Sequence, residues 1–302
     1  MRRLLIDTDT ASDDSVAIIM SLRNSYNISI EALTIVAGNV ELEKCVQNAL
    51  YTLELCGRTD IPVYSGASKP IELELGQADF VHGEDGLGGV GLDLKGRIPA
   101  QGQAVDKIIE LAYLYEGELE LVMIGPHTNI ALALKKDPSI AKKIKHCYIM
   151  GGTGRGMGNI TPYAEFNIWV DPHAANIVFQ SGMKMTLIGW DVTVQYANIF
   201  PNDMKEIEKI QTRYSNHFIQ VIQGYIRFKK QYKEDFIELA DPLAMSVVLN
   251  PEIILESEYL NLMVTESSND YRGEIKTTPG DIQVVCHVKP TEFLKLLKES
   301  LN

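Results

Sequence analysis

Long apolar runs are missing from the sequence, which argues against a membrane-spanning helix. No run approaches the roughly 18 apolar residues that cross a bilayer. After Arg2 and Arg3, too few apolar residues precede Asp7 for a secretory signal, so we expect a cytoplasmic protein. Cysteine is also scarce, and none has the CxxC spacing of a zinc or redox site: Cys45, Cys56, Cys147 and Cys286. These cysteines lie in apolar patterns, which predicts reduced thiols in the core.

Positive charge is in short supply. The 302 residues include 40 acidic and 28 basic side chains, and the net charge of −12 argues against nucleic acid or a membrane surface as a partner. Hydrophobic residues make up 45% of the chain, which is enough to bury a full core. Because no Pro-rich or low-complexity linker and no internal repeat divides the sequence, we predict a single domain over residues 1–302.

Acidic residues gather near the N-terminus, in the stretch LLIDTDTASDD at residues 4–14. The apolar run before Asp7 predicts a buried strand. Residues two apart in a strand point the same way, so Asp7 and Asp9 should lie on one side. Ser12 can then cap a helix whose first turn holds Asp13 and Asp14. The four carboxylates are therefore predicted to converge on one strand-to-helix turn.

Such a cluster is costly without a counter-ion. Two carboxylates about 4 Å apart repel by roughly 4 kcal/mol at an effective dielectric of about 20, and a helix N-terminus returns only about 0.3 to 1 kcal/mol per acid. Oxygen ligands without nearby Cys or His suit Ca²⁺ or Mg²⁺ rather than zinc. A plain helix cap would account for Asp13 and Asp14, but it fits poorly with Asp7 and Asp9 beside an apolar strand. The Gly and Glu of an EF-hand loop are missing from the stretch.

Strand and helix patterns alternate along the first two thirds of the chain. Strands are predicted at 30–36, 61–64, 120–124, 145–150 and 184–188, and helices at 41–55, 104–115 and 171–180, with another helix opened by GPHTN at 125–129. This alternation predicts an α/β fold with a mostly parallel, doubly wound (Rossmann-like) sheet and helices on both faces. Two Gly-rich loops, 65–100 and 151–167, are too long for ordinary connections, so we expect them to be functional.

Beyond Pro201 the pattern changes. A long helical region is predicted at 202–233, then a shorter helix at 240–249 and a closing helix from Pro290. Three alternating segments, 259–266, 273–277 and 282–288, are predicted to be antiparallel strands. Ligands of parallel sheets bind at the carboxyl ends of the strands. Polar or loop-flanking residues at those predicted ends are Asp7, Asp9, Asn39, Met150 and Asp191.

Nine blocks of the sequence resemble those of the inosine-uridine preferring nucleoside N-ribohydrolases, in the same order. They are DTDTASDD at 7–14, VAGN at 36–39, HGEDGLG at 82–88, GPHTNIALAL at 125–134, MGG at 150–152, GNITPYAEFN at 158–167, VDP at 170–172, WDVT at 190–193 and ADPLA at 240–244. The first block matches the DxDxxxDD signature of that family. One block alone would be weak evidence, but nine in order over roughly residues 4–290 are specific.

The resemblance implies hydrolysis of the N-glycosidic bond of a ribonucleoside to ribose and free base. It also implies a tightly held Ca²⁺ and a homo-oligomer, either dimer or tetramer. The ion would be held by Asp9, Asp14, Asp241 and the backbone carbonyl of Ile124, with Asp7 close beside it. Asp9 would accept a proton from the attacking water as general base. The ribose would be held by Asp13, Asn159, Glu165, Asn167 and the region of Met150, with Asn39 supporting the site.

The transition state of this reaction resembles an oxocarbenium ion, and nearby carboxylates and amide oxygens would stabilise its charge. The resemblance therefore gives Asp13 and Asn167 catalytic as well as binding roles. Contacts to the base are assigned to His82, Tyr225 and Tyr232. Tyr225, Phe228 and Tyr232 lie at helical spacing and would be core residues by default, with a lid over the base as the alternative, and His82 could belong to a surface loop.

Other site residues also have a purely structural interpretation. Asn39 and Asn159 each follow a glycine, and Gly-Asn is an ordinary turn signal. Asp241 precedes a proline, as helix N-caps often do. Glu165 and Asn167 could form a solvated loop edge, although alternation around the aromatic residue between them predicts that they share one side.

The sequence departs from the family at one position. Many members have a His directly before the last metal-ligand Asp, and it is thought to protonate the leaving base, whereas this chain has Ala240. Alanine cannot donate a proton, so we expect leaving-group activation by that route to be absent. Trp169 and Trp190 cannot be assigned to stacking on a purine, and the base preference stays open.

Two other functions remain open. IDTDT also satisfies the strand-end signature of haloacid-dehalogenase-type phosphotransferases, which use Mg²⁺, with Asp7 as nucleophile. The GDxxxD-like motif of that fold is not met, because Val285 stands four residues after Asp281. The second possibility is a nucleoside sensor that keeps ribose and Ca²⁺ binding but has lost turnover through Ala240. The full carboxylate set argues against that loss.

Overall fold

The computed structural model describes residues 1–24, 26–153, 156–267 and 269–302. Within these residues a nine-stranded sheet has the order β10-β9-β11-β6-β5-β4-β1-β2-β3. Its strands are β1 (Arg2–Thr8), β2 (Ile28–Ile35), β3 (Val63–Ser65), β4 (Leu119–Met123), β5 (His146–Met150), β6 (Met185–Ile188), β9 (Ile254–Val264), β10 (Ile275–Pro279) and β11 (Ile282–Val288). The pairs from β3 across to β11 are parallel, and β9 is antiparallel to both β11 and β10.

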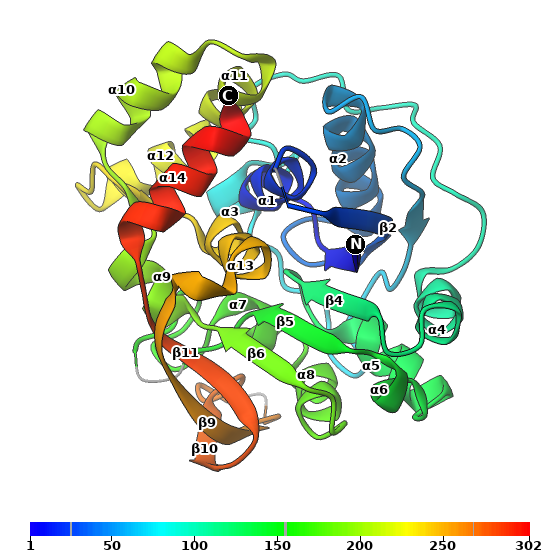
Figure 1. The fold of residues 1–302 in the computed structure, drawn as a ribbon. Helices are drawn as coiled ribbons and strands as arrows, with labels where there is room; N and C mark the ends of the chain where they lie inside the picture. Colours follow the sequence, from blue (N-terminus) through cyan, green and yellow to red (C-terminus); the bar gives the residue numbers. More distant parts are fainter. Residues whose placement is uncertain (25, 154–155, 268) are drawn as a thin grey trace.

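Helices cover both faces of the sheet, because its central strands are apolar on both sides. In β1, Leu4 and Ile6 join the core on one face and Leu5 joins the core on the other. The first face carries α1 (Ser12–Leu22), α2 (Leu42–Leu55), α11 (Arg213–Val221), α13 (Ala240–Leu249) and α14 (Pro290–Leu301). The second face carries α4 (Ala104–Leu114), α5 (Thr128–Lys136), α6 (Ile140–Lys143) and α8 (Pro172–Phe179). Figure 1 shows these two helical layers.

The remaining elements gather beyond the arrowheads of β4, β5 and β6 in Figure 1. They are α3 (Asp79–His82), α7 (Phe166–Val170), α9 (Trp190–Tyr196), α10 (Pro201–Ile210), α12 (Gln223–Gln231) and the antiparallel pair of β7 (Asn198–Ile199) and β8 (Ile237–Glu238). Both long Gly-rich segments contribute to this group, since α3 lies within 65–100 and α7 begins at the end of 151–167. The carboxyl edge of the parallel sheet is thus where the irregular chain collects.

The predicted α/β fold with a doubly wound, mostly parallel sheet is confirmed, and the predicted elements agree to within a few residues in most cases. The helical region predicted at 202–233 is confirmed, and three successive helices, α10, α11 and α12, occupy it. Gln211 has a left-handed backbone with φ 56°, which ends α10, and Thr212 Oγ1 then accepts a hydrogen bond from Ser215 N to cap α11. The third C-terminal strand is antiparallel only to β9 and pairs in parallel with β6.

The prediction that all four cysteines lie in the core is confirmed for only two of them. Cys45 and Cys147 are buried as predicted, but Cys56 and Cys286 are only half-buried, because they lie near the ends of their elements.

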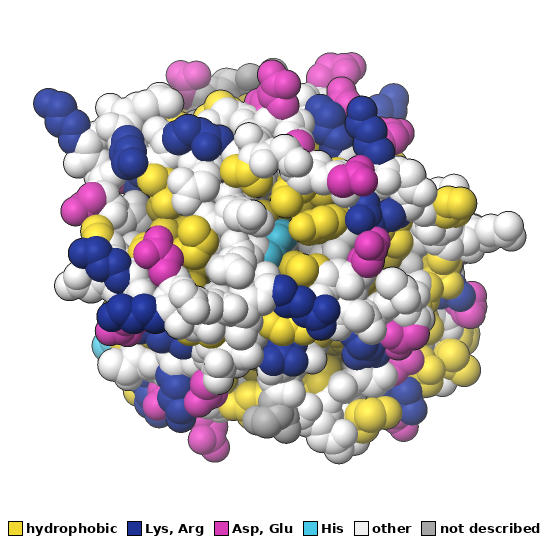
Figure 2. Space-filling view, turned by 90° about the horizontal axis from the view of Figure 1, so that it is seen from above, with side chains coloured by type: hydrophobic (Ala, Val, Ile, Leu, Met, Phe, Trp, Pro, Cys, Tyr) yellow, Lys and Arg dark blue, Asp and Glu magenta, His cyan; other side chains and the backbone are white. Residues whose placement is uncertain are grey.

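Across the described residues, no helix has both the length and the apolar character to traverse a bilayer. Figure 2 shows one face of the molecule, where hydrophobic side chains gather around a histidine and charged side chains of both signs lie farther out. The acidic surplus therefore does not form one continuous patch on this face.

Candidate active site

The site lies where the sheet topology changes direction. From β1 the chain moves outward through β2 and β3 and then returns to add β4 on the other side of β1. The carboxyl ends of β1 and β4 are therefore adjacent, and the loops that follow them diverge to opposite sides. Such a switch point leaves a crevice in which α/β proteins bind ligands. Thr8 ends β1 and Met123 ends β4, so Asp9 and Ile124 both face this crevice from the first loop positions.

Three carboxylates meet beside the crevice. Asp13, Asp14 and Asp241 each offer an oxygen, and these three atoms lie within 4.8 Å of one another. Asp14 is fixed by hydrogen bonds from Thr8 Oγ1 at 2.6 Å and from the backbone N of Ala11 at 2.8 Å. Ala11 is the N-cap of α1, so the prediction of Ser12 as the cap is wrong, and the carboxylate of Asp14 satisfies the cap backbone instead. Asp241 stands in the first turn of α13 rather than at its N-cap.

Asp9 lies behind this cluster and is completely buried. Its Oδ2 accepts a hydrogen bond from the backbone N of Asn39 at 2.7 Å, whereas its Oδ1 has no hydrogen-bond partner among the described residues. Glycine is required on both sides of it. A Cβ at Gly38 would lie 2.1 Å from Oδ2, and one at Gly125 would lie 2.8 Å from Oδ1. The GN and GP turns of the two family blocks thus make room for one buried carboxylate.

The electrostatics of the cluster call for a positive charge. Burial, followed by the charge of Asp14, raises the pKa of Asp9 well above its ordinary value. Burial and the charge of Asp13 raise the pKa of Asp14 to about 7. The pKa of Asp241 is raised by burial and by the other three acids. Buried like charges are destabilising unless neutralised, so the donor set fits a hard, oxygen-preferring cation.

Asp7 occupies a different environment from the other acids. Its Oδ2 accepts hydrogen bonds from Thr34 Oγ1 at 2.6 Å and from Asn129 Nδ2 at 2.9 Å, and burial raises its pKa to about 7. Its Oδ1 has no partner in the described part of the chain. The structure therefore ties Asp7 to β2 and α5 and groups Asp13, rather than Asp7 or Asp9, with Asp14 and Asp241.

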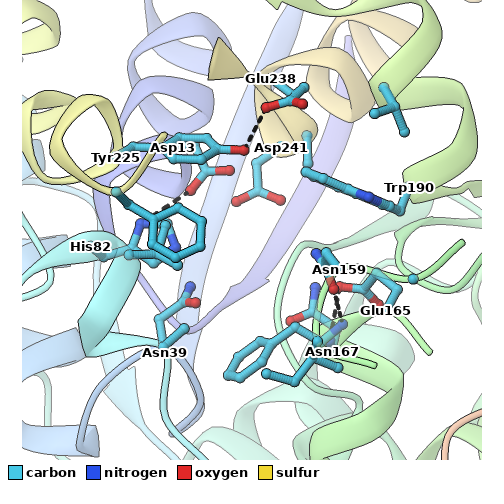
Figure 3. A pocket seen from close by; sticks show the side chains of 18 of the residues that line it. Asp13, Asn39, His82, Asn159, Glu165, Asn167, Trp190, Tyr225, Glu238 and Asp241 are labelled. Carbon is cyan, nitrogen blue, oxygen red and sulfur yellow. Dashed lines mark hydrogen bonds and ion pairs between the residues drawn. The ribbon is translucent and has the colours of Figure 1, made fainter. Parts of the chain in front are cut away.

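A cavity of about 600 Å³ opens in front of the cluster. Eleven of the fourteen predicted site residues line it: Asp13, Asn39, His82, Ile124, Met150, Asn159, Glu165, Asn167, Tyr225, Tyr232 and Asp241. The other three, Asp7, Asp9 and Asp14, lie behind the lining and are buried. Figure 3 shows Asp13 and Asp241 between His82, Tyr225 and Asn39 on one side and Trp190, Glu165, Asn159 and Asn167 on the other.

The polar side of the cavity is built on the N-terminus of α7. Glu165 is its N-cap, with Oε1 accepting from Asn167 N at 2.8 Å and Oε2 accepting from Gly152 N at 2.8 Å. Burial raises the pKa of Glu165 to about 7. Asn167 Nδ2 donates to the carbonyls of Ile124 and Met150, at 3.4 Å each. Both residues do line one side, but through a helix cap; the strand-like alternation predicted for them is wrong.

His82 closes the opposite side. Its Nδ1 lies 2.6 Å from Ser12 Oγ and 3.9 Å from Asp13 Oδ1. Burial lowers the pKa of His82, and the nearby Asp13 opposes that shift. Only 9% of the side chain is exposed, so the expectation that this polar segment stays at the surface is wrong for His82. Tyr225 is buried and also lines the cavity, so it is a core residue that can still contact a ligand. Tyr232 lines the cavity at its mouth, where 64% of the side chain is exposed.

Comparison with known proteins identifies the family. A family model for inosine-uridine preferring nucleoside hydrolases matches residues 4–295. The chain belongs to the inosine-uridine preferring nucleoside hydrolases. This nucleoside hydrolase is 39% identical over 257 residues to the pyrimidine-specific ribonucleoside hydrolase RihA of Escherichia coli. The matched residues make up 84% of this chain and 82% of RihA.

Solved nucleoside hydrolases agree over nearly the whole length. The plant nucleoside hydrolase PpNRh1 is 32% identical with a TM-score of 0.94, covering 99% of this chain and 98% of that one. The purine-preferring ribonucleoside hydrolase of Gardnerella vaginalis is 31% identical with a TM-score of 0.92 and the same coverage. The protein is therefore a hydrolase acting on N-glycosyl compounds, with ribonucleosides as its small-molecule substrates.

Sequence reasoning missed a polar group at the mouth of this nucleoside hydrolase's cavity. Tyr225 donates to Glu238 Oε2 at 2.8 Å, Lys229 donates to Glu238 Oε1 at 2.8 Å, and Lys229 also pairs with Glu234. All four residues line the cavity, as does Trp190 from α9. The spacing of Tyr225 and Lys229 on one helix face was a signal that could have found the lysine. Nothing in the sequence predicts that β8 brings Glu238 against that face.

Proposed function

We propose that the protein hydrolyses the N-glycosidic bond of ribonucleosides to ribose and free base, in a reaction that depends on Ca²⁺ and uses Asp9 as general base. One observation carries the proposal. A buried carboxylate whose Oδ1 has no partner among the described residues, that of Asp9, lies behind a carboxylate cluster that borders a cavity of nucleoside size. The haloacid-dehalogenase alternative finds no support in the family match, which extends over residues 4–295.

The cation would be held by Asp9, Asp14, Asp241 and the carbonyl of Ile124, with Asp7 nearby. Support comes from the raised pKa values of these acids and from the all-oxygen donor set. Asp13 lies close enough to Asp14 and Asp241 to share in this role, although we assign it to the ribose. When bound, the cation would offset the carboxylate charge and make a neighbouring water more acidic.

Asp9 is suited to accept the proton of that water. The backbone N of Asn39 holds Oδ2, so the carboxylate cannot rotate freely, and Oδ1 remains available as an acceptor. A general base positioned in this way is typically worth about 10² to 10⁴ in rate. The backbone hydrogen bond also explains how Asn39 supports the site without touching the reacting atoms.

The polar side of the cavity would hold the ribose. Asp13, Asn159, Glu165, Asn167 and Met150 line this region. As the glycosidic bond lengthens, positive charge develops on the ribose ring, and the Asp13 and Glu165 carboxylates together with the Asn167 amide oxygen can stabilise it. Asn159 is held in place because its Oδ1 accepts from the backbone N of Phe166 at 2.8 Å. Hydrogen bonds to the hydroxyls would fix the sugar for attack.

The base would lie at the mouth, beside His82, Tyr225 and Tyr232, which line that part of the cavity. The relatives differ here, since one is named for pyrimidine specificity and another for purine preference, so the relatives assign neither base class. We also propose that the protein is a cytoplasmic homo-oligomer, a dimer or tetramer, on the strength of the family resemblance. Light scattering would give its mass in solution.

The test is a panel of purine and pyrimidine ribonucleosides assayed for release of reducing sugar. We expect ribose release that stops when a chelator removes the cation and returns when Ca²⁺ is added back. Binding of nucleosides without any sugar release, in protein that carries its cation, would instead identify a sensor. Ribose release that continues undiminished after chelation would refute the dependence on Ca²⁺.

A further inference from the structure

Ala240 leaves the base end of the cavity without a proton donor at the position directly before Asp241. Its side chain lines the cavity. A methyl group cannot donate a proton. Any nucleoside whose base leaves as an anion must therefore draw its proton from elsewhere.

Tyr225 is a poor substitute. Its hydroxyl already donates to Glu238 Oε2 at 2.8 Å, so its proton is held by a carboxylate and is not free for a leaving base. Burial and the charge of Glu238 raise the pKa of Tyr225 well above its ordinary value. Lys229 is similarly engaged, because its amine lies between the carboxylates of Glu238 and Glu234.

Aromatic rings make up much of the same end. Phe228 lies 5.6 Å from Phe80, 5.3 Å from Tyr232 and 6.4 Å from Tyr225, measured between ring centroids. These four rings come from α3, α12 and the residue that follows α12, and all four line the cavity. The faces of aromatic rings attract cations as well as planar bases.

The charge at this end is negative. Glu234 and Glu238 face one lysine among the described lining residues outside the acid cluster, so the local sum is one negative charge. Glu238 is only 3% exposed, which limits screening by water. A flat group with a positive charge would thus meet aromatic faces and a net negative charge in the same place.

We propose that the preferred substrates are ribosides whose base carries a fixed positive charge, such as pyridinium ribosides or ribosides of 7-alkylated purines. This inference rests on the proposed function and specifies its substrate class. The missing donor at position 240, the aromatic rings and the negative charge all favour the same kind of base.

The bond changes explain why such a substrate needs no acid. Water forms the new bond to C1′ and gives its proton to Asp9, while the C1′–N bond breaks and its electron pair goes to the base nitrogen. In a pyridinium riboside that pair neutralises the positive charge, so the base leaves as a neutral molecule. In uridine or inosine the same pair makes an anion, which must collect a proton. The cationic substrate therefore loses nothing through Ala240.

The experiment compares kcat/KM for the riboside of 3-carbamoylpyridinium with the values for uridine and inosine. We expect the cation to be cleaved at least about 10² faster, which is the lower limit of the usual contribution of general acid catalysis. Because pyridinium ribosides are also intrinsically more reactive, Ala240→His is measured alongside. That variant should speed uridine or inosine cleavage by about 10-fold or more and leave the cation unchanged.

Two substitutions of opposite sign test the charge. Glu238→Gln should raise KM for the cation by about 3- to 10-fold, and Lys229→Gln should lower it by a similar factor, with smaller effects on uridine. Glu256→Gln, at an exposed position on β9, is the control and should change neither substrate. Lys229→Gln keeps the test decisive if Glu238→Gln fails to fold.

The outcomes separate the two proposals. Cleavage of uridine or inosine as fast as the cation, or equal effects of the charge variants on both substrates, would overturn the substrate class and leave the proposed function standing. Failure to release ribose from any of the three substrates would refute the proposed function, and the substrate class with it.

Discussion

Among single residues, Asp9 has two carboxylate oxygens in different environments. One oxygen is held by the backbone N of Asn39, and the other is buried without a partner among the described residues. The sequence predicted the importance of Asp9 from its place after an apolar strand and from the family block. It could not predict that Gly38 and Gly125 crowd this side chain, because that contact joins the ends of β2 and β4.

Asp9→Asn should lower turnover by about 10² to 10⁴ while the protein stays folded, because the amide keeps an oxygen toward the cation but cannot accept the water's proton. Kinetics with saturating nucleoside, together with metal analysis of the same preparation, would measure this. Unchanged turnover in a variant that still carries its cation would show that another group is the base, with Asp7 and Asp13 the next candidates.

His127 gives a prediction about stability and pH. It is fully buried against Phe179, neither ring nitrogen has a partner within the described chain, and burial lowers its pKa to about 3. In the unfolded chain the imidazole of His127 binds a proton below pH about 6.5, whereas in the folded protein it stays neutral down to about pH 3. The free energy of unfolding therefore decreases as the pH falls from about 6.5 toward 3. In His127→Leu this loss should disappear. The unfolding free energies of variant and wild type should diverge by about 1 kcal/mol between pH 6 and 5 in urea titrations, and parallel curves would contradict the prediction.

Among the elements, the region after Pro201 shows what periodicity can and cannot predict. Tyr225, Phe228 and Tyr232 recur at helical spacing, and a long helical region was predicted at 202–233 without any breaks being located in it. The first break falls at Gln211, whose φ of 56° is unfavourable for a residue with a Cβ. The capping residue Thr212 was visible in the sequence, but a left-handed glutamine is not a recognisable stop signal. After the break, α11 packs against α1 and α14 and buries Phe218 in the core.

Gln211→Gly should therefore stabilise the protein by about 0.5 to 1 kcal/mol, since glycine adopts a left-handed backbone without strain. The matched control is Gln220→Gly, inside α11 at an exposed position, which should cost about 1 kcal/mol because it only adds flexibility. Chemical denaturation of both variants measures the two effects. Equal destabilisation by both would show that the backbone at Gln211 carries no strain.

For the whole molecule, the mostly parallel sheet and the binding edge at the carboxyl ends of its strands could be predicted, because alternating strands and helices permit few topologies, whereas the order of the strands was not predicted. Asn39, Ile124 and Met150 line the cavity for the same reason, since they lie at or just after strand ends that meet at one edge, whereas His82, Tyr225 and Tyr232 were assigned only through the family resemblance. The contact of Lys229 with Glu238 could not be predicted, because α12 and β8 meet only after the chain beyond the parallel sheet has folded back.

The assignment of the calcium site is tested most directly by elemental analysis of the wild-type protein, Asp14→Ala and Asp241→Ala. The calcium content of each is measured after removal of free ions. We expect about one calcium per wild-type chain and almost none in either variant, because each substitution removes a ligand oxygen from the cluster. Full calcium occupancy in both variants would contradict the assignment of Asp14 and Asp241 as ligands, and with it the central claim.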